Sequence, residues 1–387
     1  MKDNKKLKIK IIIFFINFLF LIYFLFDKIL AFYTYIKIEK YLIIYNNNNL
    51  INHKYFNKND KPKVSIICPV FNREKYLIRF INSIQNQIFN DIELIFVDDC
   101  SNDKSIQIIE KCKKNDKRII LIKNKKNKGT FISRNIGVLT SKGDYLILPD
   151  PDDIISRDII YKCYNFVKRH NFEMIRFNIY RGKNRIFFNH IINKLESRSI
   201  YQPELSSYLF YGLKKLKQID FNVCNKFVKR TAYIKALNFI KRYYLEIYML
   251  VFEDGLMNFM LYRTVKSFYY IKKIGYYYIK NNDSITKRKK NKKVPKIQIL
   301  NYIFIYLKII FEFTKNSSHE KNMCNFVLQE LFRQNKLIFN IEYLNNDYKF
   351  YYNIINIYLN SKFINIKNKN LLINLKNLIK KNENILL

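Results

Sequence analysis

The sequence predicts an α/β fold in which a central sheet is covered by helices on both faces. Short apolar runs predict buried strands, and they alternate with segments whose apolar residues recur at helical spacing. Each expected strand is followed by an expected helix, which is the order typical of parallel sheets. The alternation begins at Lys63 and is regular to about residue 157, with weaker periodicity beyond.

The expected strands are continuous apolar runs, as strands buried on both faces require. They span 64–70, 92–97, 118–122, 144–149 and 173–180. The expected helices carry apolar side chains on one face, and they lie at about 76–84, 106–112, 131–140 and 158–169. Because ligands of open α/β sheets bind beyond the carboxyl ends of the strands, the residues that follow these strands are the candidates for a functional site.

The N-terminus combines lysines with an apolar run. The run from Ile11 to Phe26 has about 16 residues, slightly short of a usual membrane span but sufficient for a thin bilayer. The preceding lysines favour a cytoplasmic N-terminus. A cleaved signal peptide is the alternative, although no small-residue cleavage site follows the run. We expect a single-pass membrane protein whose bulk, in a eukaryotic cell, faces the lumen of the Golgi or endoplasmic reticulum.

Composition divides the chain into five expected regions. They are a cytoplasmic tail (1–10), a transmembrane signal anchor (11–27), a stem or linker rich in asparagine (28–61), an α/β domain (62–290) and a helical C-terminal extension (291–387).

The 387-residue chain has a formal net charge of +39, with its lysines spread along the sequence. We expect this charge to attract anionic membrane surfaces and anionic substrates. No nucleic-acid-binding motif accompanies it, so nucleic acid is not an expected partner. The six cysteines lack paired spacing, which indicates neither a zinc site nor a disulfide framework, and we expect most of them in the core.

Three carboxylates follow the expected strand at 144–149. Asp150, Asp152 and Asp153 are separated only by Pro151. Carboxylates crowded at a strand end repel one another unless a hard cation lies between them, and Mg²⁺ or Mn²⁺ prefers oxygen ligands. The alternative is a turn followed by a helix N-cap.

Two more acidic pairs stand out. Asp98 and Asp99 end the second strand, where an aspartate can accept hydrogen bonds from a base or ribose, or can form a turn. Glu253 and Asp254 lie between apolar residues, and adjacent carboxylates in that setting raise each other's proton affinity, as suits a general base. Surface acidic pairs are also common. Before one expected helix, Gly129 gives backbone freedom, and Arg134 in that helix can pair with phosphate.

Taken in order, these segments resemble the family 2 glycosyltransferases with the GT-A fold. The matching segments are Val64–Asn72, Val97–Ser101, Lys128–Gly129 with Ser133–Gly137, Asp150–Asp153, Asn225–Lys226 before Lys229–Arg230, Glu253–Asp254, and a Tyr-rich strand before Ser284–Thr286. Each motif alone is weak, but the ordered set is specific, and it covers about residues 63 to 287. Pro151 departs from the family, because that position is often small or polar.

The resemblance implies a Rossmann-like mixed sheet flanked by helices, a nucleotide-sugar donor, a divalent metal (Mn²⁺ or Mg²⁺) and inversion at the anomeric carbon. The implied donor-binding residues are Pro69, Asn72, Asp98, Asp99, Arg134 and Asp150, with Asp99 on the nucleobase. The implied metal ligands are Asp150, Asp152 and Asp153. Asp254 matches the general base, and Glu253 is expected to tune or orient it.

Further expectations concern partners. UDP is the expected nucleotide by resemblance alone, and the acceptor can be a glycan, a protein or a lipid. Transfer is expected to be non-processive, because the Q-x-x-R-W signature is missing from a chain without tryptophan. The alternative is an inactive protein of the same fold that binds nucleotide sugars, or acts as a scaffold, without turnover.

Overall fold

The computed structural model describes residues 61–181, 185–186, 199–201, 222–241, 253–279 and 281, together with 370, 373 and 377. Within this part of the chain no helix is long and apolar enough to cross a membrane. The expected anchor at 11–27, the regions at its two sides up to residue 60 and nearly all of the extension at 291–387 lie outside the described residues.

One mixed sheet organises the described residues. Its strands are β1 (Val64–Val70), β2 (Ile92–Asp98), β3 (Ile119–Lys123), β4 (Tyr145–Ile147), β5 (Ile154–Ile155), β6 (Met174–Arg181), β7 (Arg185–Ile186), β8 (Ile200–Tyr201), β9 (Lys226–Lys229) and β10 (Ser267–Tyr278). The order is β3-β2-β1-β4-β9-β6-β10-β5, with β7 paired to β6 and β8 to β10. Strands β3, β2, β1 and β4 are mutually parallel, whereas β9 is antiparallel to both of its neighbours. The expected mixed sheet flanked by helices is thus confirmed.

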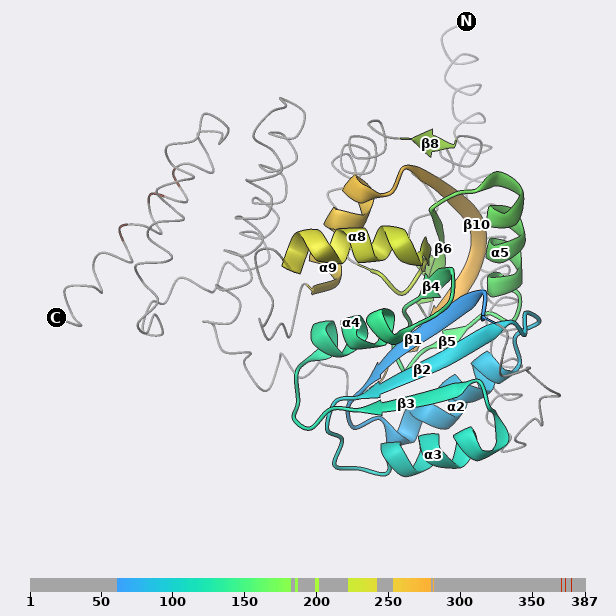
Figure 1. The fold of residues 1–387 in the computed structure, drawn as a ribbon, viewed down its shortest axis with the longest axis vertical. Helices are drawn as coiled ribbons and strands as arrows, with labels where there is room; N and C mark the ends of the chain where they lie inside the picture. Colours follow the sequence, from blue (N-terminus) through green and yellow to red (C-terminus); the bar gives the residue numbers. More distant parts are fainter. Residues whose placement is uncertain are drawn as a thin grey trace, which may run out of the picture.

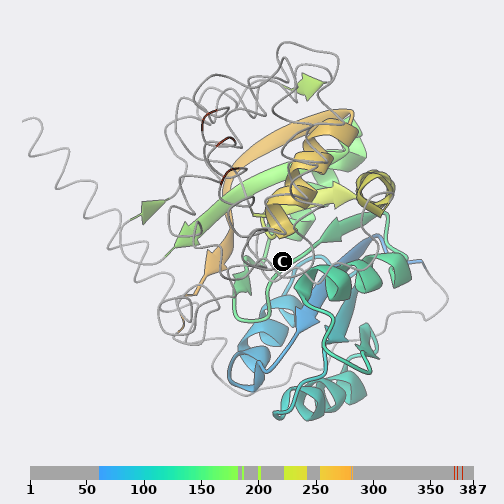
Figure 2. The same cartoon turned by 90° about the vertical axis from the view of Figure 1, so that its left-hand side faces the viewer.

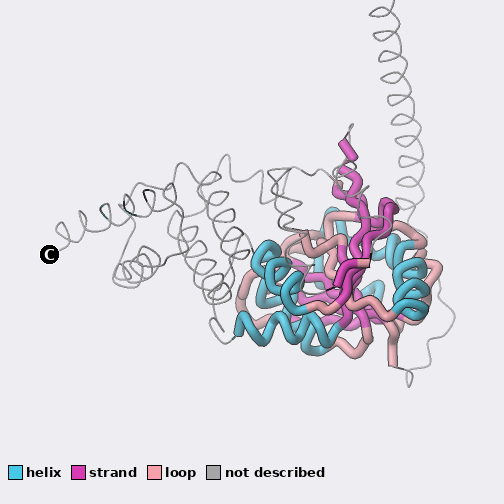
Figure 3. Tube along the Cα trace, turned by 90° about the horizontal axis from the view of Figure 1, so that it is seen from above, coloured by secondary structure: helices cyan, strands magenta, loops and turns pink. Residues whose placement is uncertain are grey.

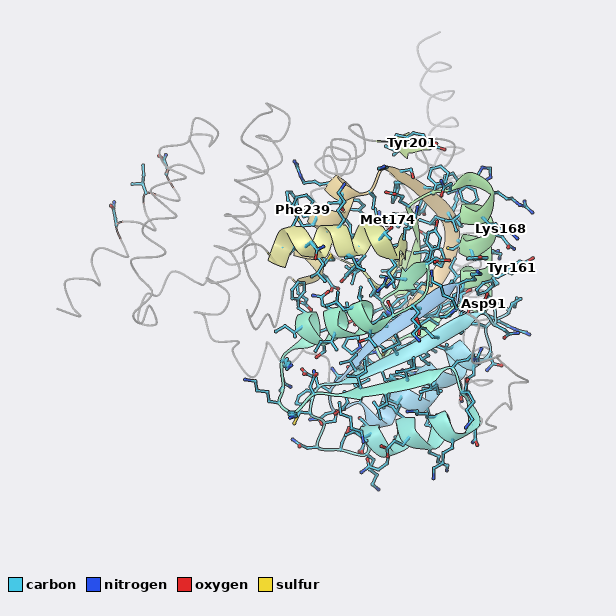
Figure 4. The ribbon with its side chains drawn as sticks, viewed as in Figure 1. Asp91, Tyr161, Lys168, Met174, Tyr201 and Phe239 are labelled. Atoms are coloured by element: carbon cyan, nitrogen blue, oxygen red, sulfur yellow. The ribbon has the colours of Figure 1, made fainter. Side chains whose placement is uncertain are left out.

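Helices cover both faces of this sheet (Figures 1 and 3). They are α2 (Glu74–Gln85), α3 (Ser105–Asn115), α4 (Thr130–Thr140), α5 (Ile159–His170), α8 (Arg230–Lys241) and α9 (Glu253–Thr264). In Figure 1, α2 and α3 lie below strands β1 to β3, and α4, α8 and α9 lie above. On the outer side of α5, Tyr161 and Lys168 are exposed (Figure 4).

The core lies on the two sides of the central strands. Every residue of β1 and β2 is buried, as expected for strands sandwiched between helical layers. On one face Gly137 lets α4 approach closely, because a Cβ at that position would lie 2.4 Å from the Ile67 Cγ2 atom. The first half of the fold therefore holds α4 tightly against β1 and β2.

Strand β10 is long and curved, and it runs beside β6 (Figure 2). Its parallel pairing with β6 shifts register between Ile271 and Ile274 and again before Tyr276. Such irregularities bend a strand and increase its twist. At its end β10 pairs antiparallel with the short β5, which directly follows the acidic turn at 150–153. A late segment of the chain thus returns to the edge where β1, β2 and β4 end.

Sequence and structure differ in two respects. The strand expected at 144–149 ends at Ile147, and Leu148 and Pro149 lie outside the sheet before the acidic turn at 150–153. Strand β9 and helices α8 and α9 were not expected as elements, because the apolar pattern is irregular there. Helix α9 shows why: its residues are buried nearly all round, so its sequence has no polar face.

Candidate active site

The acidic residues identified in the sequence gather at one edge of the sheet. Val70, the last residue of β1, is paired in register with Asp98, the last residue of β2. Strand β4 is parallel to β1 and ends on the same side, so its following turn, 150–153, lies at this edge too. These strand ends are the usual ligand-binding edge of an α/β sheet.

Asp99 is fully used in holding a loop. Its Oδ1 accepts hydrogen bonds from the Lys128 backbone N–H (2.8 Å) and the Asn124 amide (2.9 Å), and its Oδ2 accepts from the Gly129 N–H (2.8 Å). Gly129 has a φ of 85°, a conformation that glycine adopts without strain. Asp99 therefore fixes the loop that precedes α4. Its expected contact with a nucleobase stays a prediction, and these bonds do not favour it.

The neighbouring carboxylate, Asp98, has one oxygen that can still accept a hydrogen bond. It is buried, and its Oδ2 accepts a hydrogen bond from the Ser101 backbone N–H at 3.1 Å. Its Oδ1 is buried with no hydrogen-bond partner among the described residues. Leaving a carboxylate oxygen without a partner costs free energy, which a ligand N–H can recover.

Pro69 and Asn72 surround the same strand end. Pro69 lies inside β1, beyond the residues that pair with β4, so its missing N–H breaks no bond of that ladder. Asn72 has a φ of 52°, and its N–H donates to the Ser101 hydroxyl (3.0 Å). Its side-chain oxygen accepts from the Asn102 N–H (2.8 Å). These bonds join the loops after β1 and β2 into one unit.

The acidic turn is fastened to β10. The Tyr276 hydroxyl accepts a hydrogen bond from the Asp150 N–H (3.0 Å) and donates to Asp153 Oδ2 (2.7 Å). The Ile279 N–H donates to Asp153 Oδ1 (2.8 Å). Burial, followed by the charges of Asp152 and Asp150, raises the pKa of the Asp153 carboxyl well above its usual range. Asp153, expected as a metal ligand, thus has both oxygens engaged in holding the turn.

Asp152 points toward two polar side chains. Its Oδ2 accepts a hydrogen bond from the Asn281 amide (2.6 Å) and lies 4.0 Å from the Arg73 Nε. The guanidinium of Arg79 also donates to the Asp152 carbonyl oxygen (2.9 Å). Asp152 is therefore held from α2 on one side and from the segment after β10 on the other.

Arg134 joins the acidic turn to α9. Its Nη1 donates to Asp254 Oδ1 (2.5 Å) and its Nη2 to Asp150 Oδ1 (3.2 Å). The Arg134 side chain is only 4% exposed, whereas those of Asp150 and Asp254 are 38% and 26% exposed. Although burial alone would lower it, the charges of Asp254 and Asp150 raise the pKa of Arg134, which therefore stays protonated.

Two carboxyls at this edge titrate near neutral pH. Burial, followed by the charge of Asp254, raises the pKa of Glu253 to about 7. For Asp150, burial outweighs the opposing charge of Arg134, and the pKa rises to about 7 as well. Since 38% of the Asp150 side chain meets solvent, water screens part of this effect. Both acids can change protonation state where enzymes usually work.

No set of three or more acidic, histidine or cysteine side chains in the described residues is arranged to hold a metal by itself. Asp150 and Asp152 nevertheless fit a metal that takes its remaining ligands from a substrate, because Mg²⁺ is usually bound through one or two carboxylates plus phosphate oxygens. The 38% exposure of Asp150 leaves it accessible to such a group.

Three residues that hold the site were not singled out in the sequence. Tyr276 was noted only within a Tyr-rich strand, and nothing in its neighbourhood distinguishes it from a core tyrosine. Arg73 and Asn281 carry no local signal either, because their partner Asp152 is distant in the chain. The described cysteines are free, and all but the half-buried Cys100 are buried, as expected.

The model of glycosyl transferase family 2 matches residues 65–237. An uncharacterized glycosyltransferase of Haemophilus influenzae is 36% identical over 178 residues, or 46% of this chain and 66% of that protein. The minor teichoic acid biosynthesis protein GgaB of Bacillus subtilis is 31% identical over 193 residues, or 49% of this chain and 20% of that protein. The chain thus matches only part of each relative's length.

Among solved structures, S. aureus TarS 1–349 in complex with UDP superposes with a TM-score of 0.59 at 18% identity, covering 83% of this chain and 88% of that one. At this identity the likeness shows the fold. Together with the matched family model and the glycosyltransferase relatives, it shows that the chain belongs to glycosyl transferase family 2, with a GT-A fold.

Proposed function

We propose that this protein is an inverting glycosyltransferase that moves a sugar from a nucleotide-diphosphate donor to an acceptor hydroxyl. The observation that carries the proposal is the meeting of Asp150 and Asp254 on one guanidinium at the carboxyl edge of the sheet. These acids come from elements far apart in the chain, and both keep part of their surface exposed. Such convergence serves a reaction rather than the packing of the core.

A UDP-linked sugar is the donor we propose. Structures of S. aureus TarS contain UDP and UDP-GlcNAc, which supports this choice by analogy of fold. We assign recognition of the base to Asp98 rather than Asp99, because Asp98 Oδ1 lacks a partner among the described residues and Asp99 is fully bonded to the loop before α4. Pro69 and Asn72 line the same strand ends and complete this part of the site.

Asp150 and Asp152 are the residues that we propose to hold a divalent metal together with the donor diphosphate. When bound, Mn²⁺ or Mg²⁺ supplies a positive charge that neutralises the leaving diphosphate. We do not include Asp153, because its carboxylate oxygens are occupied by Tyr276 and Ile279. Its part in this proposal is to keep the turn in place.

Asp254 is the proposed general base. In the step, the acceptor oxygen forms a bond to the anomeric carbon, while the bond from that carbon to the diphosphate oxygen breaks and its electron pair leaves with the diphosphate. The acceptor proton passes to the Asp254 carboxylate. Glu253, whose pKa is about 7, lies beside it at the start of α9 and adjusts the local charge. Positioned bases of this kind contribute about 10²–10⁴ in rate.

For the acceptor we propose an anionic, hydroxyl-bearing polymer. The net charge of +39 favours anionic partners over long range. A poly(ribitol-phosphate) beta-glucosyltransferase of Bacillus spizizenii is among the relatives, 27% identical over 222 residues, which cover 35% of its length. Attachment to a membrane through residues 11–27 remains part of the proposal and accords with a bulky surface polymer as acceptor.

The test is donor turnover by the full-length chain. Purified protein is incubated with a panel of nucleotide sugars, with Mn²⁺ or with a chelator, and release of free nucleotide is measured. Metal-dependent release from one donor supports the proposal and identifies that donor. A folded protein that binds UDP but releases nothing from any donor, with ribitol-phosphate polymer present or absent, overturns it in favour of an inactive binding protein.

A further inference from the structure

Arg134 is placed differently from a residue that binds a substrate phosphate. Its guanidinium is 4% exposed and already faces two carboxylates, Asp150 and Asp254. A cation that binds the donor diphosphate must offer its charge to the ligand, and here the two carboxylates already balance that charge. Its Nε is buried without a hydrogen-bond partner among the described residues, so this further donor is enclosed as well. The expected contact of Arg134 with the donor is therefore not favoured.

The backbone that carries Arg134 is held firmly. Helix α4 begins at a loop fixed by Asp99 and packs on β1 and β2, where Gly137 permits close approach. The residues that it joins follow it in the chain by 16 positions (Asp150) and by 120 positions (Asp254). A rigid element in the middle of the site thus presents one planar cation to two separate segments. The fork of a guanidinium can bond two carboxylates at once, which an ammonium cannot do with the same geometry.

We propose that Arg134 is a positioning residue, which fixes the carboxylate of Asp254 relative to the acidic turn at Asp150. This inference rests on the proposed function, in which Asp254 is the base and the acidic turn holds the donor. Arg134 bonds to both and so forms a bridge between them. The bond to Asp254 Oδ1 leaves Oδ2 as the oxygen that receives the acceptor proton. The bond to Asp150 ties the base to the segment that holds the donor. Arg134 thereby sets the distance between the acceptor oxygen and the sugar.

Loss of the bridge affects the chemical step more than donor binding. Without the guanidinium, the carboxylates of Asp150 and Asp254 repel each other. The first turn of α9 also loses its ion pair with α4. A displacement of the base by about 1 Å is expected to lower kcat about 100-fold. Of the proposed donor and metal contacts, only Asp150 bonds to Arg134. The others do not bond to it and stay in place, namely Asp98, Pro69, Asn72 and Asp152. Donor binding is therefore expected to change little.

The test compares Arg134→Ala, Arg134→Lys and wild type in kcat, donor KM and UDP affinity. We expect kcat to fall about 100-fold in Arg134→Ala, with donor KM and UDP affinity within about threefold of wild type. Arg134→Lys should retain part of kcat, because an ammonium can pair with one carboxylate at a time. Guanidinium ion at non-denaturing concentration should restore kcat of Arg134→Ala at least tenfold by occupying the vacated position.

A matched control is Arg118→Ala. Arg118 is equally buried and makes a two-bond ion pair with Asp116 (2.9 and 2.8 Å) between α3 and β3. It should lose stability but keep kcat per folded molecule, and guanidinium should not raise its activity.

Two results would overturn the inference, and a third would refute the function on which it rests. A tenfold or larger increase in donor KM with nearly unchanged kcat would assign Arg134 to the donor phosphates instead. Activity loss in Arg134→Ala and Arg134→Lys that follows only the unfolded fraction, without rescue by guanidinium, would leave it a purely structural role. Wild-type protein without turnover of any donor would refute the proposed function itself, which the variants do not test.

Discussion

Replacing Tyr276 by phenylalanine removes two hydrogen bonds from the acidic turn and changes no packing volume apart from the hydroxyl. Tyr276 is fully buried. Its hydroxyl accepts from the Asp150 N–H and donates to Asp153, so a single oxygen atom holds both ends of the turn. The substitution leaves an N–H without its partner, and Asp153 retains only its bond from the Ile279 N–H.

The expected loss of unfolding free energy is the sum of these two contributions. A typical hydrogen bond contributes about 0.5–1.5 kcal/mol, and Tyr276 makes two. Tyr276→Phe should therefore destabilise the protein by about 1–3 kcal/mol. Because the turn then loses its fixed position, kcat should fall as well, beyond the effect of unfolding. Both effects originate at the end of β10, far from Asp150 in sequence.

Urea denaturation measures the first effect, and transfer at saturating donor measures the second. Tyr145→Phe is the matched control, because the Tyr145 hydroxyl donates one neutral bond, to the Phe172 carbonyl oxygen (3.1 Å). It should cost about 1 kcal/mol and leave kcat unchanged. If Tyr276→Phe lowers the free energy of unfolding by less than about 1 kcal/mol, or by the same amount as Tyr145→Phe, the Tyr276 hydroxyl does not hold the acidic turn as described.

Three further substitutions test other parts of the structure. Asp98→Ala should weaken UDP binding by about 10- to 150-fold in calorimetry, since a lost hydrogen bond to a charged group is worth about 1.5–3 kcal/mol. Unchanged affinity would remove Asp98 from the donor site. The folded-state pKa of Glu253, about 7, lies above its usual value of 4.5, so the native protein holds the proton longer and stability falls as pH rises from about 4.5 to 7. Glu253→Gln should reduce this fall in urea midpoints between pH 5 and 7.5, and an identical pH profile would contradict the shift. Gly137→Ala should cost about 1–3 kcal/mol, because its Cβ would lie 2.4 Å from the Ile67 Cγ2 atom; a midpoint equal to wild type in thermal unfolding would show that α4 can move away.

The first half of the fold is predictable from the sequence for a physical reason. Strands β1, β2 and β3 are apolar runs next to amphipathic helices, and each such pair is adjacent in the chain. The acids at the ends of β2 and β4 are therefore placed at one edge by topology alone. The shared position of Asp98 and the acidic turn follows from parallel pairing, without knowledge of any side-chain contact.

The contacts within the site are not predictable in the same way. Asp98 and Asp99 are adjacent and chemically identical, yet one is saturated by a loop and the other keeps a free oxygen among the described residues. The difference depends on the residues at 124–129, which donate to the carboxylate of Asp99 and not to that of Asp98. Asp153 is similar, because only the return of β10 shows that Tyr276 takes its oxygen. Patterns in sequence report which elements form, whereas these differences arise from contacts between distant segments.

The return of β10 to the acidic turn has a consequence for biosynthesis. The turn is held by residues that follow it by more than 120 positions, so a nascent chain that has left the ribosome only as far as α8 carries the acids without their support. Contacts this far apart in sequence form late and slowly in folding. A growing chain should consequently gain the ability to turn over a donor only after the segment at Tyr276–Asn281 has emerged. Until then the acidic turn lacks its contacts with β10 and Asn281, so we expect no transfer during synthesis.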